Sequence, residues 1–310
     1  MLKRGFTVHQ GAVAGGRTWS APPAGGDRTF PSSDSASSLL KKAERVLAAF
    51  DCAHPQLSLT EVIRRSGLSR SSTHRILDQL VQLHWLDREG RNYRLGIRLV
   101  EHGGRAAQHN RLLRAAVPRL DRLHEATGKM VQLHVLDGMD VVCHDRVGTL
   151  DDHSVATHIG ARLPAHCTAA GKALLGFGDP ADVKRVLEAG LQPLTPHTVT
   201  RPFLFRTELA LVRKEGVAFD WEGSCQGLVA AAAPLRGAGR AIAAVSLSSW
   251  GGHRTIERLA PLLQSCVRSI WSELYGLGRA ARFTPLEAPP ATVPVPMDSM
   301  NRWARSNNWM

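Results

Sequence analysis

The sequence lacks clustered cysteines and long apolar runs. Its five cysteines lie far apart with no C-x-x-C pair, which argues against a zinc module and a disulfide framework. Residues 1–16 hold no sustained apolar segment, and the best apolar run, residues 228–235, is far too short to span a bilayer. We therefore expect a cytoplasmic globular protein that has no membrane partner.

Length and composition indicate how many globular domains the chain can form, but they do not identify its function. The chain has 310 residues, of which 43% are hydrophobic and 21% charged, and this suits two ordinary globular cores. The formal net charge of +12 suits a polyanionic partner, although the basic residues are spread along the whole chain. Charge alone therefore does not identify the partner.

Low-complexity segments mark the two ends. Residues 1–35 are rich in Gly, Pro, Ser and Ala without an apolar period, and residues 281–310 contain several prolines, so both are expected to be disordered. Between them we expect three segments: a first domain over residues 36–96, a linker helix over 97–110 and a second domain over 111–280.

The first domain has the start and stop signals of a helix-turn-helix. Residues 38–50 have apolar side chains at helical spacing, and Ser58 with Glu61 forms a capping box that opens a short helix ending at Gly67. Ser69 caps a second helix two residues later, and this tight turn is the spacing of the motif. A polar turn between residues 85 and 95 then predicts a β-hairpin, which would be the wing.

The helix after Ser69 has the pattern of a recognition helix. A helical wheel places Thr73, Ile76, Leu77 and Leu80 inward and leaves a short, polar and basic outer face. Such a face is also typical of any solvated helix, but the succession of capped helices, glycine turn and basic hairpin favours DNA binding. The residues expected to contact DNA are Arg70, Ser71, Ser72, His74 and Arg75 on the helix and Arg88, Arg91 and Arg94 on the hairpin.

The remaining pattern predicts an α+β second domain. Residues 97–127 are helical, with a bend or break expected at Gly103 and Gly104. Strands are expected over residues 130–136, 141–147 and 241–247, and a closing helix over 256–277. Fold class is therefore α+β.

Two features of this domain suggest a ligand site. Thr168 can cap a helix that starts at Ala169, and a helix start suits an anion such as a carboxylate. Ser246 and Ser248 share one face of a strand, where buried hydroxyls need partners. The alternatives are that these hydroxyls bond to nearby backbone and that the alanines at the helix start reflect close packing.

Several segments resemble one family in its own order. LTEVIRRSGLSRSSTHRIL at residues 59–77 is similar to the helix-turn-helix signature of IclR-type regulators, and LPAHCTAAGKALL at residues 163–175 is similar to their sensor motif. Residues 93–96, 216–234 and 243–248 extend the resemblance.

The resemblance implies a winged helix-turn-helix joined by a linker helix to a GAF-like α/β effector-binding domain with an antiparallel sheet. It also implies a homodimer or homotetramer that binds a palindromic DNA operator, controls a catabolic operon and senses a small organic acid, aromatic acids included.

The resemblance also assigns effector-contacting positions. These are Ala169, Ala170, Asp220, Leu228, Ala230, Ser246 and Ser248. The chain departs from the pattern at Trp221 and Gly223, which interrupt an acidic stretch, and at Ala230, where some members carry Cys. A larger, more aromatic ligand would fit these departures, although Trp221 can also be a core residue.

The other motifs that could indicate nucleotide binding, metal binding or catalysis are incomplete. Ala170-Gly171-Lys172 lacks the first glycine and the final Ser or Thr of a phosphate loop. The histidines of the second half match no metal-ligand spacing, and His166 and Cys167 have no orienting third group. We therefore expect no catalytic residue, no metal and no cofactor. The alternative from another class is an enzyme or metabolite-binding module whose winged helix serves as a protein-interaction surface.

Overall fold

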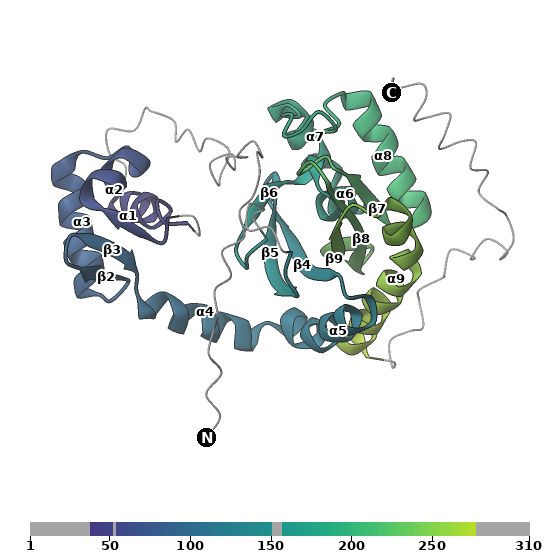
Figure 1. The fold of residues 1–310 in the computed structure, drawn as a ribbon, viewed down its shortest axis with the longest axis horizontal. Coiled ribbons are helices and arrows are strands. Elements are labelled where there is room, and N and C mark those ends of the chain that lie inside the picture. The colour runs from purple at the N-terminus through teal and green to yellow at the C-terminus, as the bar shows by residue number, and fades with distance from the viewer. Residues whose placement is uncertain (1–37, 52–53, 151–156, 277–310) are drawn as a thin grey trace, which may run out of the picture. The chain divides into compact units, whose positions relative to one another are not determined.

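The computed structural model describes residues 38–51, 54–150 and 157–276 (Figure 1). The arm expected at residues 1–35 and the tail expected at 281–310 lie outside these residues. Among the helices that are described, none is long and apolar enough to cross a membrane. The described chain contains an N-terminal three-stranded sheet with helices and a C-terminal six-stranded sheet with helices, so the α+β expectation is confirmed.

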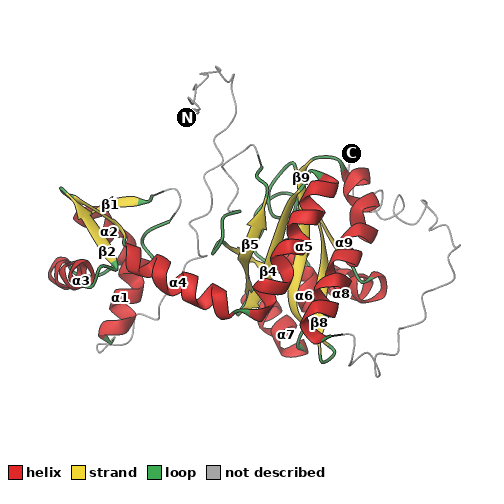
Figure 2. Cartoon of the chain, turned by 90° about the horizontal axis from the view of Figure 1, so that it is seen from below, coloured by secondary structure: helices red, strands yellow, loops and turns green. Residues whose placement is uncertain are grey.

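The N-terminal part packs three helices against a small antiparallel sheet (Figure 2). Its strands lie in the order β1-β3-β2, and β2 and β3 form the predicted hairpin. The elements are α1 (Leu39–Leu47), β1 (Gln56–Ser58), α2 (Leu59–Ser66), α3 (Arg70–Gln82), β2 (Leu86–Glu89) and β3 (Asn92–Leu95). Strand β1 was not expected from the sequence.

Local signals position these elements as predicted. The Ser58 hydroxyl accepts a hydrogen bond from the Glu61 amide, and the Glu61 carboxylate accepts one from the Ser58 amide, which completes the capping box. Gly67 ends α2 with φ of 65°, a left-handed conformation that glycine adopts without strain. The Ser69 hydroxyl then caps α3 by accepting from the Ser72 amide.

The helical segment after the hairpin breaks at a different residue from the one expected. It forms α4 (Ile97–His109) and α5 (Arg111–Thr127), and Gly103 and Gly104 lie inside α4, so the expected break there is wrong. The reason is capping at Asn110, whose side chain accepts hydrogen bonds from the first two amides beyond Arg111. A glycine weakens a helix by about 1 kcal/mol but does not by itself end it.

The C-terminal part is an antiparallel sheet with helices on both faces (Figure 1). Its strands lie in the order β6-β5-β4-β9-β8-β7. The elements are β4 (Met130–Asp137), β5 (Asp140–Val147), β6 (Arg162–Pro164), the short 3-10 helix η1 (Ala165–Cys167), α6 (Ala169–Gly176), α7 (Pro180–Ala189), α8 (Pro202–Glu215), β7 (Ala218–Trp221), β8 (Leu228–Gly237), β9 (Arg240–Trp250) and α9 (His253–Tyr275). The expected strands appear as β4, β5 and β9, and the expected closing helix appears as α9.

The two faces of this sheet bury separate cores. Leu120 of α5 and Leu263 of α9 pack on one face, where an ion pair of 3.0 Å between Arg119 and Glu273 also joins these helices. Leu174 of α6 and others pack on the opposite face, together with side chains of α7 and α8. Because side chains alternate along a strand, β8 and β9 contribute to both cores.

Candidate functional site

Helix α3 presents a polar face above a packed core. Its inward side chains, Thr73, Ile76, Leu77 and Leu80, are all buried, as the helical wheel predicted. The helix residues expected to contact DNA, Arg70, Ser71, Ser72, His74 and Arg75, are exposed or half-buried. The structure therefore brings the expected helix residues together on one accessible surface.

The polar groups of this surface differ in how free they are. His74 Nδ1 lies 2.9 Å from the Asp78 carboxylate, and the Ser72 hydroxyl accepts a hydrogen bond of 3.0 Å from Ser69. Arg70 and Arg75 form no ion pair or hydrogen bond with the described residues. Their guanidinium groups are thus available for phosphates or for the acceptor edge of a guanine.

The wing arginines are also unequal. Arg88 donates to the Gly90 carbonyl at 3.1 Å and lies over the Tyr93 ring. Arg94 pairs with two carboxylates of the same hairpin, at 3.4 and 2.9 Å. Arg91 is exposed and has no such contact within the part of the chain that the structure describes. Of the three, Arg91 has the charge least compensated by its neighbours.

Arg45 is a positioning residue that sequence reasoning missed. Its guanidinium donates to the Ser66 carbonyl and so ties α1 to the turn between α2 and α3. A Cβ added at Gly67 would meet the same guanidinium at 2.9 Å. This contact spans 21 residues, so no local pattern could have indicated it.

In the C-terminal part, the register of the sheet gathers most of the expected effector residues on one face. Asp220 pairs with Ala230 across β7 and β8, and Ala230 pairs with Ser248 across β8 and β9. Ser246 lies two residues from Ser248 on β9, and Leu228 lies two residues from Ala230 on β8. We call this row, with the residues of β4 that face the same way, the effector face.

Helix α6 starts against the effector face. The Thr168 hydroxyl caps it by accepting from the Gly171 amide at 3.0 Å, as predicted. Ala169 and Ala170 are both buried at this start. Gly171 is required by close packing, because a Cβ there would lie 2.0 Å from the Ala165 carbonyl oxygen. Close packing thus requires a small residue at this start of α6.

The Asp220 carboxylate is already engaged by its own protein. It accepts hydrogen bonds from the Gly223 amide at 3.0 Å and from the Ser224 amide and hydroxyl at 3.2 and 2.6 Å. Burial raises the pKa of Asp220 despite the nearby Lys172 ammonium, whose Nζ lies 4.0 Å away. Its geometry is that of a residue that shapes the loop after β7, and contact with an effector stays a prediction.

Lys172 and Glu208 form a buried ion pair that the sequence did not indicate. Lys172 Nζ lies 3.0 Å from Glu208 of α8 and donates to the Phe219 carbonyl of β7 at 3.3 Å. Burial acts to lower the pKa of Lys172, but the carboxylates of Glu208 and Asp220 outweigh it and the net shift is upward. Lys172 therefore stays charged and links α6, α8 and β7.

Trp221 lies on the other face of the sheet. It stacks on Phe219 with ring centroids 5.1 Å apart and on His253 with centroids 4.9 Å apart, and it packs against the core beneath α5 and α9. Since Asp220 points to the effector face, its neighbour in the strand points away from it. Trp221 therefore packs with a core, which is the alternative that the sequence left open, and the size of the ligand stays a prediction.

Two further residues of the effector face escaped sequence reasoning. Gln132 and His134 of β4 are both buried on it, and His134 Nε2 lies 3.1 Å from the Ser246 hydroxyl. Gln132 donates to the Thr157 carbonyl at 3.2 Å. The available signal was the alternation of β4, which places polar side chains at both positions of an otherwise apolar strand.

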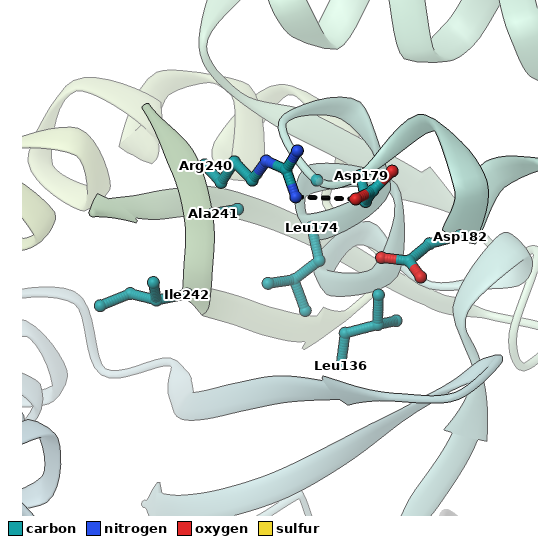
Figure 3. Close-up of a pocket in the computed structure, with 8 residues that line it drawn as sticks. Leu136, Leu174, Asp179, Asp182, Arg240, Ala241 and Ile242 are labelled. Atoms are coloured by element: carbon teal, nitrogen blue, oxygen red, sulfur yellow. Dashed lines mark hydrogen bonds and ion pairs between the residues drawn. The ribbon is translucent and has the colours of Figure 1, made fainter. Parts of the chain in front are cut away.

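A separate surface pocket of about 210 Å³ lies at one end of the same sheet (Figure 3). Leu136, Leu174 and Ile242 supply apolar walls, and an ion pair of 2.7 Å between Arg240 and Asp179 spans the polar side. None of the residues that the sequence assigned to an effector lines this pocket.

Comparisons with known proteins agree with this arrangement. The family model described as "Bacterial transcriptional regulator IclR C-terminal" matches residues 104–271, and that described as "IclR helix-turn-helix domain" matches residues 39–90. The chain belongs to the IclR family. Both matches together span more than half of the chain, and they cover α3 as well as the effector face.

Relatives of this IclR-family chain include regulators of named operons. The HTH-type transcriptional regulator XynR of Escherichia coli is 34% identical over 220 residues, covering 68% of this chain and 86% of the relative. The Pca operon regulatory protein of Acinetobacter baylyi is 27% identical over 243 residues, covering 74% and 87%. The crystal structure of an IclR homologue from Microbacterium hydrocarbonoxydans, complexed with 4-hydroxybenzoate, has a TM-score of 0.67 and 29% identity, covering 76% and 99%.

The chain is therefore a DNA-binding transcriptional regulator with a C-terminal effector domain, and it is not an enzyme. The structure gives His166 and Cys167 structural roles. His166 Nε2 lies 2.9 Å from the Gln192 carbonyl oxygen, and burial strongly raises the pKa of the Cys167 thiol. Among the described residues, no group of His, Cys, Asp and Glu has the arrangement of a metal site.

Proposed function

We propose that this regulator binds a palindromic operator as a homodimer or homotetramer and responds to a small organic acid, aromatic acids included. The observation that supports an acid is the start of α6, where the buried Ala169 and Ala170 pack in the same core cluster as Ala230 of the effector face. A helix start carries a partial positive charge and unpaired amides, which together favour a carboxylate.

The homologue complexed with 4-hydroxybenzoate supports this ligand class, since its fold covers the effector face of this chain. The Pca operon regulatory protein supports control of an operon, and we propose a catabolic one. The effector-contacting residues in this proposal are Ala169, Ala170, Leu228, Ala230, Ser246 and Ser248, with Asp220 at the margin. Because a bacterial regulator meets DNA in the cytoplasm, we also propose that location.

For DNA we propose that Arg70, Ser71, Ser72, His74 and Arg75 enter the major groove while Arg88, Arg91 and Arg94 approach the backbone. Two symmetry-related copies would place two such helices on the half-sites of a palindrome.

Footprinting of the full chain on its own upstream region, with and without a panel of aliphatic and aromatic acids, tests both halves of the proposal. We expect a salt-sensitive, sequence-selective footprint that one class of acid alters. A footprint that no acid changes would contradict the sensing half alone.

Arg75→Ala tests the proposed reading helix. Because Arg75 is exposed and has no partner among the described residues, its loss should leave the fold intact and weaken specific binding by roughly tenfold or more in a gel-shift assay. The matched control is Arg258→Ala on α9 of the C-terminal part, which is also exposed and should bind as the wild type does. Unchanged affinity and selectivity of Arg75→Ala would remove this residue from the reading surface.

A further inference from the structure

His134 lies on the effector face with one ring nitrogen unused. It is 6% exposed, and the alternation of β4 aligns it with Gln132 on the side covered by α6. Its Nε2 lies 3.1 Å from the Ser246 hydroxyl. Its Nδ1 is buried and has no hydrogen-bond partner among the described residues.

An unused buried nitrogen needs an explanation, because native proteins pair nearly all buried polar groups. Among the described residues, one other buried side-chain atom forms no hydrogen bond, an oxygen of Glu208. That oxygen is explained by its 3.0 Å ion pair with Lys172. His134 Nδ1 has no such counterpart. Ser248 is a buried residue of the same face, and its hydroxyl forms no hydrogen bond within the described part of the chain.

The state of the imidazole limits what can satisfy it. Burial lowers the pKa of His134 to about 4, so the ring is neutral at physiological pH and offers one donor and one acceptor. If Nε2 accepts from Ser246, Nδ1 carries a hydrogen and needs an acceptor; if Nε2 donates, Nδ1 needs a donor. A hydroxyl group meets either need, because it both donates and accepts.

We propose that His134 is a specificity-determining residue of the effector site, and that its Nδ1 binds a hydroxyl group of a hydroxylated organic acid whose carboxylate lies at the start of α6. This inference rests on the proposed function and narrows its ligand class. A charged carboxylate suits the helix start, and an uncharged hydroxyl suits the neutral ring.

Two conservative variants separate the two ring nitrogens. In His134→Gln the side-chain amide can replace Nε2 toward Ser246 but leaves nothing at the place of Nδ1. In His134→Asn the shorter amide replaces Nδ1 but cannot reach Ser246. His253→Asn is the matched control, because His253 is exposed and stacks on Trp221, which packs on the opposite face of the sheet.

Calorimetric titration of the full chain with 4-hydroxybenzoate and with benzoate measures the ratio of the two affinities, which tests the proposal. The wild type, His253→Asn and His134→Asn should prefer 4-hydroxybenzoate by about tenfold or more, and His134→Gln should bind both acids about equally. If His134 had only a structural role, His134→Gln would keep the preference for 4-hydroxybenzoate and His134→Asn would lose it, since only Gln preserves the Ser246 contact.

A second measurement does not depend on any variant folding. In the wild type, the nitrogen-15 resonance of His134 Nδ1 should shift on addition of 4-hydroxybenzoate and not on addition of benzoate. Equal binding of both acids by the wild type, or a preference that survives in His134→Gln, would overturn this inference and leave acid sensing intact. Failure of both acids to bind would overturn this inference together with the aromatic-acid part of the proposed function.

Discussion

On α3 the side chains that we expect to contact DNA lie on the surface, and Arg75 has no partner among the described residues. The polar groups of the effector face, in contrast, are buried and mostly paired. The surface groups keep their hydration and form their interactions only with DNA. The buried groups have already exchanged water for neighbours, as Asp220 has with Gly223 and Ser224. Their contribution to ligand binding is therefore bound up with their contribution to stability.

This difference predicts how substitutions act in the two regions. Changes on α3 should alter DNA binding while the free energy of unfolding stays nearly constant. Changes on or beside the effector face should alter both quantities, because each removed partner leaves a buried group unsatisfied.

The largest effect is expected from Lys172→Met. The substitution removes the buried cation and leaves the Glu208 carboxylate without its ion pair, while Asp220 keeps its hydrogen bonds from Gly223 and Ser224. The free energy of unfolding should therefore fall by about 3–5 kcal/mol. Urea denaturation of the full chain measures this. Lys184→Met is the control, since the Lys184–Glu188 pair is largely exposed and should contribute little. Equal stability of the two variants would mean that the buried pair does not constrain the domain.

The same contrast explains what could be read from the sequence. The helix-turn-helix follows from signals three residues apart or fewer, such as Ser58 with Glu61, and these appear in the structure where they were expected. Neighbouring residues decide such caps and turns, so an isolated segment already contains the information. The prediction fails where two local signals for a helix break compete. Gly103 and Gly104 stay helical, and the cap at Asn110 sets the break between α4 and α5.

The effector face depends on register between distant strands. His134 meets Ser246 across 112 residues, and no local pattern indicates that contact. The resemblance to the family named Ser246 and Ser248 but not His134 or Glu208. Strand β8 was not predicted because it is buried on both faces and its sequence is a continuous apolar run. Hydrophobic periodicity alone cannot tell whether such a run is a strand or a buried helix.

An intermediate effect is expected from acidification. The pKa of His134 is about 4 in the folded chain and near its ordinary 6.5 when unfolded, so the unfolded state binds this proton more readily. Stability from the neutral ring is fully present above pH 6.5 and is lost as the pH falls toward 4, by on the order of 3 kcal/mol. His134→Gln cannot titrate there.

Denaturation series at several pH values, recorded for the wild type and for His134→Gln, check this expectation. The difference in unfolding free energy between the two should shrink or reverse between pH 6.5 and 4. A constant difference over that range would show that His134 titrates normally, which would contradict its burial.

The smallest effect, and the one that tests the surface side of the comparison, is expected from the wing. Arg91→Ala removes an exposed charge that has no partner among the described residues, whereas Arg94→Ala removes one already paired with Asp87 and Glu89. If Arg91 contacts a phosphate, its loss should reduce the slope of log affinity against log salt by about 1, and Arg94→Ala should change the slope less. Neither should change stability by more than about 0.5 kcal/mol. Gel shifts over a salt series, with unfolding curves beside them, measure both quantities. An equal change in slope would mean that DNA draws Arg94 out of its hairpin contacts, so that the pairing seen on this surface, unlike the pairing on the effector face, does not restrict function.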